Sequence, residues 1–218
     1  MNILFCGYRP WAIDVYNCIS SFYPEFSFSI VKDRSEFDCF IEENKAPNII
    51  IMAGWSWIIS DEIVSKIYTV GFHPSNLPAY AGGSPLQHQI IDGITKTKGT
   101  LFRATAKLDQ GPIVYKENLS LEGGISDIFK NLTFCTIRLL TRFLDNFPDV
   151  PAIENMSTCK AKKRFRPEHS RLEKSEISKM NCIELYNFIR CKEDPYPNAF
   201  IEDETGTLIF KRTEFIHA

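Results

Sequence analysis

The sequence predicts an α/β fold, in which strands and helices alternate around a doubly wound, mostly parallel sheet. Apolar runs rich in β-branched residues, such as NIIIMAGW at residues 48–55, are typical of strands buried on both faces. Segments between these runs, such as residues 11–23, carry apolar residues at helical spacing. The 218 residues are 44% hydrophobic and 24% charged, a composition that fills one sizeable core.

The expected elements alternate as far as residue 73 and then change character. In chain order they are strand 2–6, helix 11–23, strand 26–31, helix 34–44, strand 48–55, short helix 61–67, strand 68–73, helix 84–93, strands 99–109 and 112–121, and long helix 126–147. Helix 84–93 is expected to have Ser84 as its cap, Pro85 at its first position and Gly93 at its end. This order predicts a Rossmann-like arrangement.

The pattern changes beyond Pro148, so we predict a main domain over residues 1–150 and an extension over residues 151–218. The extension begins with a basic, loop-rich link and continues with a short helix, CIELYNFIR. Two strands, NAFIED and TLIFKRT, are expected to pair as a hairpin. The exposed edge of such a hairpin invites pairing, which makes a homodimer an expectation.

Composition and charge argue against several classes of protein. The formal net charge is −2 and the main basic cluster is KAKKRFR at residues 160–166, so no nucleic-acid partner is expected. No stretch approaches the ~20 apolar residues of a membrane span, and the first apolar run lacks a basic leader. We therefore expect a cytoplasmic protein. The seven scattered cysteines include no CxxC pair and predict neither disulfides nor a metal site.

The common cofactor and hydrolase motifs are missing from the sequence. The turn after the first strand, FCGYRPWA, has one glycine in place of a GxGxxG pattern, which argues against a dinucleotide. The motifs GxxxxGK[ST], HExxH and GxSxG do not occur either.

His73 is the first candidate for chemistry, because it ends the expected strand 68–73 at the edge where open α/β sheets bind ligands. Asp109 lies later, in the turn LDQGP, and a carboxylate there can orient an imidazole and stabilise its charged form. A lone histidine is more often a structural group, so spacing alone leaves both interpretations open.

The stretch FHPSNLPAYAGGSPLQ, followed by LDQGPI, resembles the signature of the folate-dependent formyltransferases over roughly residues 50–119. Within that superfamily the chain is most similar to short sugar N-formyltransferases. The stretches that carry this finer likeness are FCGYRPWA, GWSWII, GGSPLQ and RPEHS with FIRCKEDPYPNAFIED. Methionyl-tRNA formyltransferases resemble the same core but carry a larger, basic carboxy-terminal domain.

The resemblance implies that residues 1–150 are a formyltransferase catalytic domain, which moves the formyl group of 10-formyltetrahydrofolate to the amine of an amino sugar. The sugar would be nucleotide-linked or a nonulosonic acid, used in surface-polysaccharide biosynthesis. His73 would bind the oxyanion or shuttle the amine proton, and Asp109 would hold the imidazole. Two alternatives stay open: a hydrolase of the same cofactor, and an inactive folate or nucleotide-sugar binding protein.

The resemblance also implies two sets of binding residues and no metal. The cofactor set is Trp55, Trp57, Ile58, Ile59, Leu108 and Asp109. The acceptor set is Arg9, Gly83, Ser84, Gln87 and Tyr196.

The chain departs from the family pattern at two positions. Gly71 stands where the family has an asparagine that donates to the oxyanion, and Ala81 stands where related sugar enzymes often have an arginine. Asn76 and Gln87 are the candidates to supply the missing amide, and Asn76 is therefore included among the expected catalytic residues.

Overall fold

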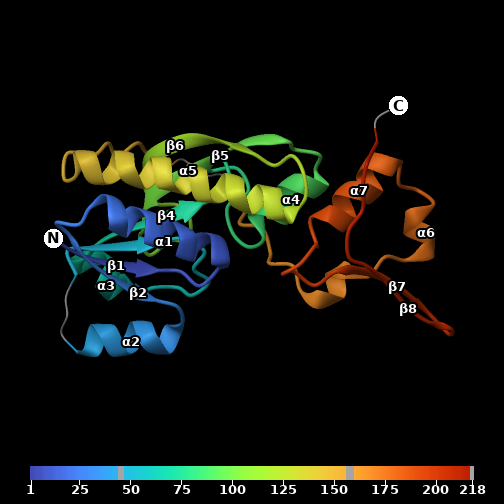
Figure 1. Cartoon of the computed structure of the whole chain (residues 1–218), viewed down its shortest axis with the longest axis horizontal. Coiled ribbons are helices and arrows are strands. Elements are labelled where there is room, and N and C mark those ends of the chain that lie inside the picture. The colour runs from blue at the N-terminus through green and yellow to red at the C-terminus, as the bar shows by residue number, and fades with distance from the viewer. Residues whose placement is uncertain (44–46, 156–159, 217–218) are drawn as a thin grey trace.

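The computed structural model describes residues 1–43, 47–155 and 160–216, and its centre is a six-stranded sheet (Figure 1). The strands are β1 (Asn2–Cys6), β2 (Ser27–Val31), β3 (Ile49–Met52), β4 (Tyr68–His73), β5 (Lys96–Arg103) and β6 (Ile113–Ser120). Their order is β2-β1-β3-β4-β5-β6. The first four strands run parallel, whereas β5 and β6 are antiparallel to their neighbours.

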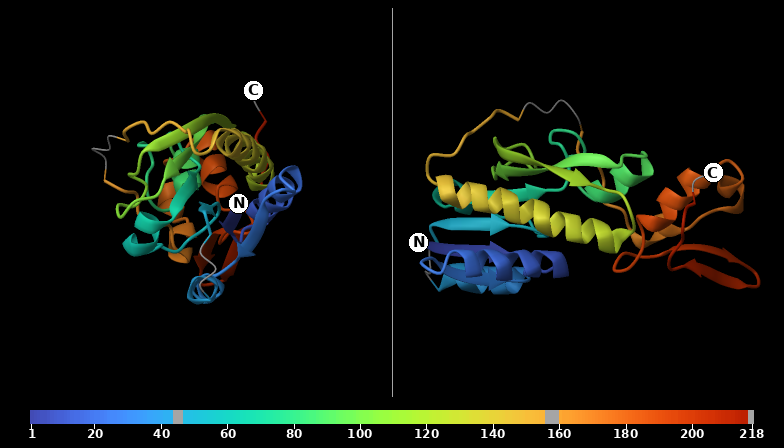
Figure 2. Two further views of the ribbon diagram at one scale, coloured as in Figure 1. Left: turned by 90° about the vertical axis from the view of Figure 1, so that its left-hand side faces the viewer. Right: turned by 45° about the horizontal axis from the view of Figure 1, so that its top comes forward.

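Helices cover both faces of the sheet, which confirms the predicted doubly wound α/β fold (Figure 2). One face packs against α1 (Pro10–Phe22), α4 (Pro85–Ile91) and α5 (Ile125–Asn146). The other face packs against α2 (Arg34–Glu42) and α3 (Asp61–Lys66).

Side-chain alternation along β1 explains this two-sided burial. Ile3 and Phe5 join the core beneath α1 and α5, while Leu4 and Cys6 join the core beneath α2 and α3. All four are almost completely shielded from solvent. A strand that is apolar at every position after Asn2 therefore lies inside the sheet, as the sequence predicts.

The predicted strand 99–109 is wrong at both ends, because β5 begins at Lys96 and stops at Arg103. Residues 104–112 instead form a loop beside the sheet edge. Gly111 lies against the carbonyl oxygen of Arg103, and a Cβ at that position would overlap it. The glycine thus lets the chain turn back immediately into β6.

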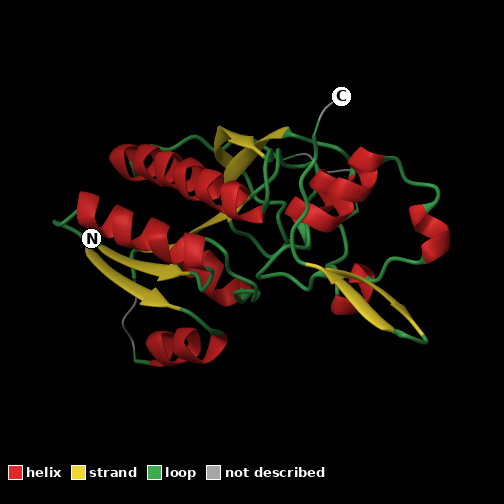
Figure 3. Cartoon of the chain, turned by 45° about the vertical axis from the view of Figure 1, so that its right-hand side comes forward, coloured by secondary structure: helices red, strands yellow, loops and turns green. Residues whose placement is uncertain are grey.

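The extension comprises a 3-10 turn (Pro167–Ser170), α6 (Lys174–Ile177), α7 (Cys182–Arg190) and the antiparallel pair β7 (Ala199–Asp203) and β8 (Gly206–Phe210) (Figure 3). The expected helix and hairpin are thus present. A small core of Leu172, Ile189 and Ala199 lies within the extension. The boundary at residue 150 and the homodimer stay predictions.

Two charged residues of the extension hold it against the start of α5. The buried Arg190 guanidinium donates to the carbonyl oxygens of Leu121 and Gly123, at 2.7 and 2.8 Å. Glu193 accepts a hydrogen bond from the backbone N–H of Ile125 at 2.9 Å.

Within the described residues, no helix is both long and apolar enough to cross a membrane.

Candidate functional site

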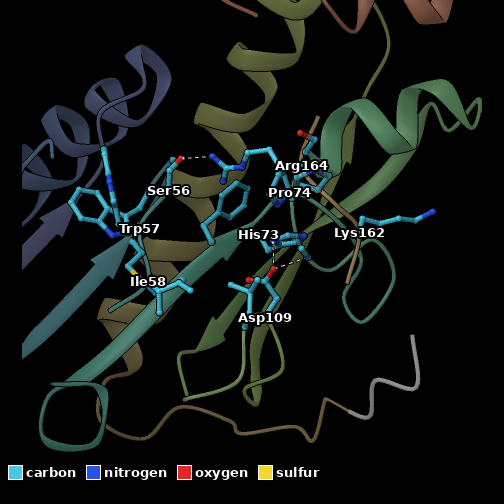
Figure 4. Close-up of a pocket in the computed structure, with 18 of the residues that line it drawn as sticks. Ser56, Trp57, Ile58, His73, Pro74, Asp109, Lys162 and Arg164 are labelled. Carbon is cyan, nitrogen blue, oxygen red and sulfur yellow. Dashed lines mark hydrogen bonds and ion pairs between the residues drawn. The ribbon is translucent and has the colours of Figure 1, made fainter. Parts of the chain in front are cut away.

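A cavity of about 690 Å³ opens at the carboxyl ends of β1, β3 and β4, where the sequence places His73 (Figure 4). The segments that follow these strands line it, together with the loop between β5 and β6 and part of the extension. This is the edge at which open α/β sheets bind ligands. Every predicted site residue except Asn76 lines the cavity.

The His73 ring is held so that one nitrogen faces a carboxylate. Its Nε2 lies 2.9 Å from the carbonyl oxygen of Tyr80, and a carbonyl only accepts, so Nε2 carries a hydrogen. Its Nδ1 lies 3.5 Å from Oδ2 of Asp109. In the neutral ring, Nδ1 therefore carries the lone pair and can take up a proton, and Asp109 then stabilises the resulting charge.

Asp109 is fixed by contacts that the sequence did not indicate. Its Oδ2 accepts a hydrogen bond from the backbone N–H of Gly82 at 2.8 Å. Its carbonyl accepts from the buried Asn155 amide at 2.9 Å. Its φ of 53° lies in the left-handed region, where aspartate and asparagine are tolerated best among residues with a Cβ. Asp109 is thus held through both its carboxylate and its backbone carbonyl.

One half of the cavity is largely apolar. The loop after β3 contributes Trp55, Trp57, Ile58 and Ile59, and the loop after β5 contributes Leu108. The two tryptophan rings lie 4.7 Å apart, while Ile58 and Leu108 are 71% and 54% exposed. Apolar walls of this kind, beside exposed backbone groups, suit a flat heterocycle such as a pterin. Phe102 and Met52 also line the cavity.

The other half is cationic and partly built by the extension. Arg9, Lys162 and Arg164 line it together with Ser84, Gln87 and Tyr196. Burial raises the pKa of the Tyr196 hydroxyl, partly offset by the Arg9 charge and a hydrogen bond with Gln87, which keeps this phenol neutral.

The basic link, predicted as a simple connection, pairs with the glycine turn beside the site. The N–H of Gly83 donates to the carbonyl oxygen of Lys162 at 2.8 Å. The N–H of Lys162 donates to the carbonyl oxygen of Ala81 at 2.7 Å. Phe165 donates its N–H to Ser84 Oγ at 3.0 Å. A Cβ on Gly83 would lie only 2.6 Å from Cα of Arg164, so the paired glycines allow this close approach. The sequence of the link has no periodicity that would predict this pairing with the glycine turn.

Of the two residues expected to supply the missing amide, Asn76 lies away from the site and Gln87 lies within it. Asn76 lies outside the cavity: its side chain is exposed and accepts a hydrogen bond from Lys116 at 2.7 Å. The turn that follows Pro74 carries it away from His73, so it cannot donate to a group bound there. At Gly71 a Cβ would lie 2.8 Å from the Phe102 ring, which occupies the space that a larger side chain would need. Gln87 does line the cavity.

Lys192 is a buried cation of the extension, close to Phe165 of the cavity lining. It is 3% exposed, and its Nζ lies 2.9 Å from the centre of the Phe188 ring and 5.6 Å from that of Phe165. Burial lowers the pKa of its ammonium group from 10.5 to about 8. Between these values the unfolded chain binds a proton that the folded chain lacks, so the unfolding free energy rises with pH.

We expect Lys192→Met to raise the unfolding temperature at pH 7, because methionine fills a similar volume without a buried charge. The stabilisation should be at most about 3 kcal/mol and should shrink as the pH rises from 8 to 10.5. Thermal unfolding of wild type, Lys192→Met and the exposed control Lys163→Met across this pH range measures the effect. A destabilised Lys192→Met at pH 7 would show that the cation–ring contacts outweigh the cost of burial.

Fold and site together define an α/β protein whose imidazole–carboxylate pair stands between an apolar and a cationic half-cavity, an arrangement suited to group transfer between two bound molecules. Residues 31–124 match the family model described as formyl transferase. This match includes His73 and Asp109 and agrees with the likeness to the folate-dependent formyltransferases that the sequence motifs predict.

Known relatives show the same likeness. A methionyl-tRNA formyltransferase of Rickettsia prowazekii (strain Madrid E) is 28% identical over 177 residues, which are 78% of this chain and 56% of that protein. The chain thus spans little more than half the length of that curated relative. The solved methionyl-tRNA formyltransferase from Clostridium thermocellum has a TM-score of 0.87 and 27% identity, covering 99% of this chain and 94% of that one.

A solved sugar N-formyltransferase from Shewanella sp FDAARGOS_354 has a TM-score of 0.76 and covers 100% of this chain and 99% of its own. Its identity is 13%, so this likeness concerns the fold alone.

Proposed function

We propose that the chain transfers the formyl group of 10-formyltetrahydrofolate to the amine of an amino sugar used in surface-polysaccharide biosynthesis. The observation that carries the proposal is the division of one cavity into two chemically different halves that meet at His73 and Asp109. The apolar half takes the pterin of the cofactor, and the cationic half takes the acceptor.

His73 and Asp109 carry the proton transfers of the proposed reaction. The acceptor amine attacks the formyl carbon, a C–N bond forms, and the carbonyl electron pair moves to the oxygen. His73 Nδ1, which lies beside Asp109 and carries the lone pair, accepts the proton that the amine loses, and Asp109 stabilises the imidazolium. When the oxyanion collapses, the bond from carbon to N10 breaks and the imidazolium returns the proton to N10. Tetrahydrofolate and an N-formyl sugar leave.

Methionyl-tRNA is the second candidate acceptor, because the relative from Rickettsia and the structure from Clostridium thermocellum are both methionyl-tRNA formyltransferases. The amino sugar is preferred because Tyr196 and the link residues Lys162, Arg164 and Phe165 line the cavity beside Arg9. We expect side chains of this kind to hold a small anionic sugar.

The proposal is tested by release of tetrahydrofolate from 10-formyltetrahydrofolate with a panel of acceptors. The panel contains nucleotide-linked 3-amino and 4-amino sugars, amino-nonulosonic acids and initiator methionyl-tRNA. Turnover that requires one amino sugar supports the proposal. Turnover with the tRNA alone would show that methionyl-tRNA is the acceptor instead. Turnover without any acceptor indicates the hydrolase, and folate binding without turnover indicates the inactive binding protein.

A further inference from the structure

Asp109 lies in a loop, residues 104–112, that contains no helix or strand and has mostly exposed side chains. The base of the loop is closed where the N–H of Arg103 donates to the carbonyl oxygen of Pro112 at 2.8 Å. Within the loop, the φ of Asp109 is 53°, a left-handed conformation that is uncommon for a residue with a Cβ. Such a conformation persists only where surrounding contacts determine it.

The link that follows α5 supplies one of these contacts. Ile153 pairs with Ile113, at the start of β6, through two backbone hydrogen bonds of 2.7 and 2.9 Å. This bridge brings Asn155 beside the loop, where its Nδ2 donates to the carbonyl oxygen of Asp109 at 2.9 Å. Because that carbonyl belongs to the peptide unit after Asp109, the bond fixes how this unit is rotated against the Cα–Cβ bond of Asp109.

A later part of the same link reaches the carboxylate of Asp109 through the glycine turn. Two backbone hydrogen bonds, of 2.7 and 2.8 Å, join Lys162 to the residues on either side of Gly82. The N–H of Gly82 donates to Oδ2 of Asp109 at 2.8 Å, and the same oxygen lies 3.5 Å from Nδ1 of His73 (Figure 4). The link thus holds Asp109 directly at its backbone and, through Gly82, at its carboxylate.

Asn155 satisfies only part of its own hydrogen-bonding capacity in this position. The residue is 8% exposed, and its Oδ1 has no hydrogen-bond partner among the residues that the structure describes. A buried amide oxygen without a partner lowers the stability of the fold. Departures of this kind are expected where a residue serves a site. The bond from its amide nitrogen to Asp109 indicates which site that is.

We propose that Asn155 is a positioning residue for the formyl transfer. Its hydrogen bond sets the direction in which the Asp109 side chain leaves the loop, and so keeps the carboxylate beside His73. Asn155 does not line the cavity, so it acts through Asp109 and touches neither bound molecule. The link is then part of the machinery that orients the imidazole–carboxylate pair. This inference rests on the proposed function for the reaction whose rate Asn155 affects.

Asn155→Leu, which keeps a similar volume and loses the donor, tests the proposal. We expect kcat to fall roughly 10-fold, because the carboxylate is no longer held in line with the imidazole. The KM values for cofactor and acceptor should change less than twofold. In an Asp109→Asn background the same substitution should also change kcat less than twofold, because the carboxylate that it positions is already gone. Glu154→Gln, at an exposed neighbour outside the cavity lining, is the matched control and should keep wild-type kcat.

A measurement without turnover separates this inference from the proposed function. In protein labelled with ¹⁵N-histidine, the NMR resonance of His73 Nδ1 is assigned with His73→Ala. It should move in Asn155→Leu in the same direction as in Asp109→Asn, and it should stay in place in Glu154→Gln. If the wild type transfers no formyl group but the resonance responds in this way, the proposed function fails and the positioning role of Asn155 stands.

The inference is overturned if Asn155→Leu, shown to be folded by thermal unfolding, keeps both the wild-type kcat and the wild-type His73 resonance. It is also overturned if the loss of kcat is equally large in the Asp109→Asn background, since Asn155 would then act independently of Asp109. A rise in KM alone would place Asn155 at a bound molecule and contradict the proposal as well. Asn155→Ala should behave like the leucine variant, and it provides the same test if leucine prevents folding.

Discussion

His73→Ala should lower kcat for formyl transfer roughly 10²–10⁴-fold, the usual contribution of a positioned acid–base group. The imidazole presents a proton-accepting Nδ1 beside Asp109, and its Nε2 already bonds the Tyr80 carbonyl. Alanine removes the ring and leaves that carbonyl without its partner. Steady-state kinetics with saturating cofactor and acceptor measure the loss.

Folding of the His73 variant must be separated from its chemistry. Loss of the hydrogen bond to Tyr80 should cost about 1 kcal/mol of unfolding free energy, which thermal unfolding detects. His169→Ala provides a matched control, because His169 is exposed and does not line the cavity. Activity of His73→Ala within threefold of the control would exclude the imidazole from the proton transfers.

Asp109→Asn should lower kcat by roughly 10²-fold or more while leaving cofactor affinity almost unchanged. Asparagine tolerates the left-handed backbone at this position, and its carbonyl oxygen can still accept from Gly82. The substitution therefore removes the negative charge beside His73 and keeps the loop in place. The larger part of the loss is then the missing stabilisation of the imidazolium.

Asp92→Asn is the control for this charge. The exposed Asp92 accepts a hydrogen bond from the Tyr80 hydroxyl at 2.8 Å, close to the site but outside the cavity lining. Removal of the Asp92 charge should change kcat less than threefold. If Asp109→Asn also retains nearly full activity, the carboxylate only positions the Gly82 turn.

The fold could be predicted because β1 and β3 are apolar at consecutive positions and the helices have a clear periodicity. The strand ending at His73 also predicted the sheet edge on which the cavity opens. The loop at residues 104–112 was missed because its residues read as a continuation of β5, and the close approach of Gly111 to Arg103 depends on the folded structure.

The candidate site was predicted less completely than the fold. The sequence motifs indicate His73 and Asp109, but nothing local indicates that Asn155 and Gly82 hold Asp109, or that Arg164 reaches Ser56. Those contacts join segments far apart in the chain. The exchange at Gly71 is likewise explained by a neighbouring strand, since Phe102 on β5 fills the adjacent space.

The most direct test of the proposed transfer follows a labelled formyl carbon from 10-formyltetrahydrofolate in the presence of a nucleoside-diphosphate-linked amino sugar. We expect the label to appear in an N-formyl amide of the sugar, in amounts equal to the tetrahydrofolate released, and to depend on His73. Label recovered as free formate, with the sugar unchanged, would contradict formyl transfer to an amine and establish hydrolysis instead.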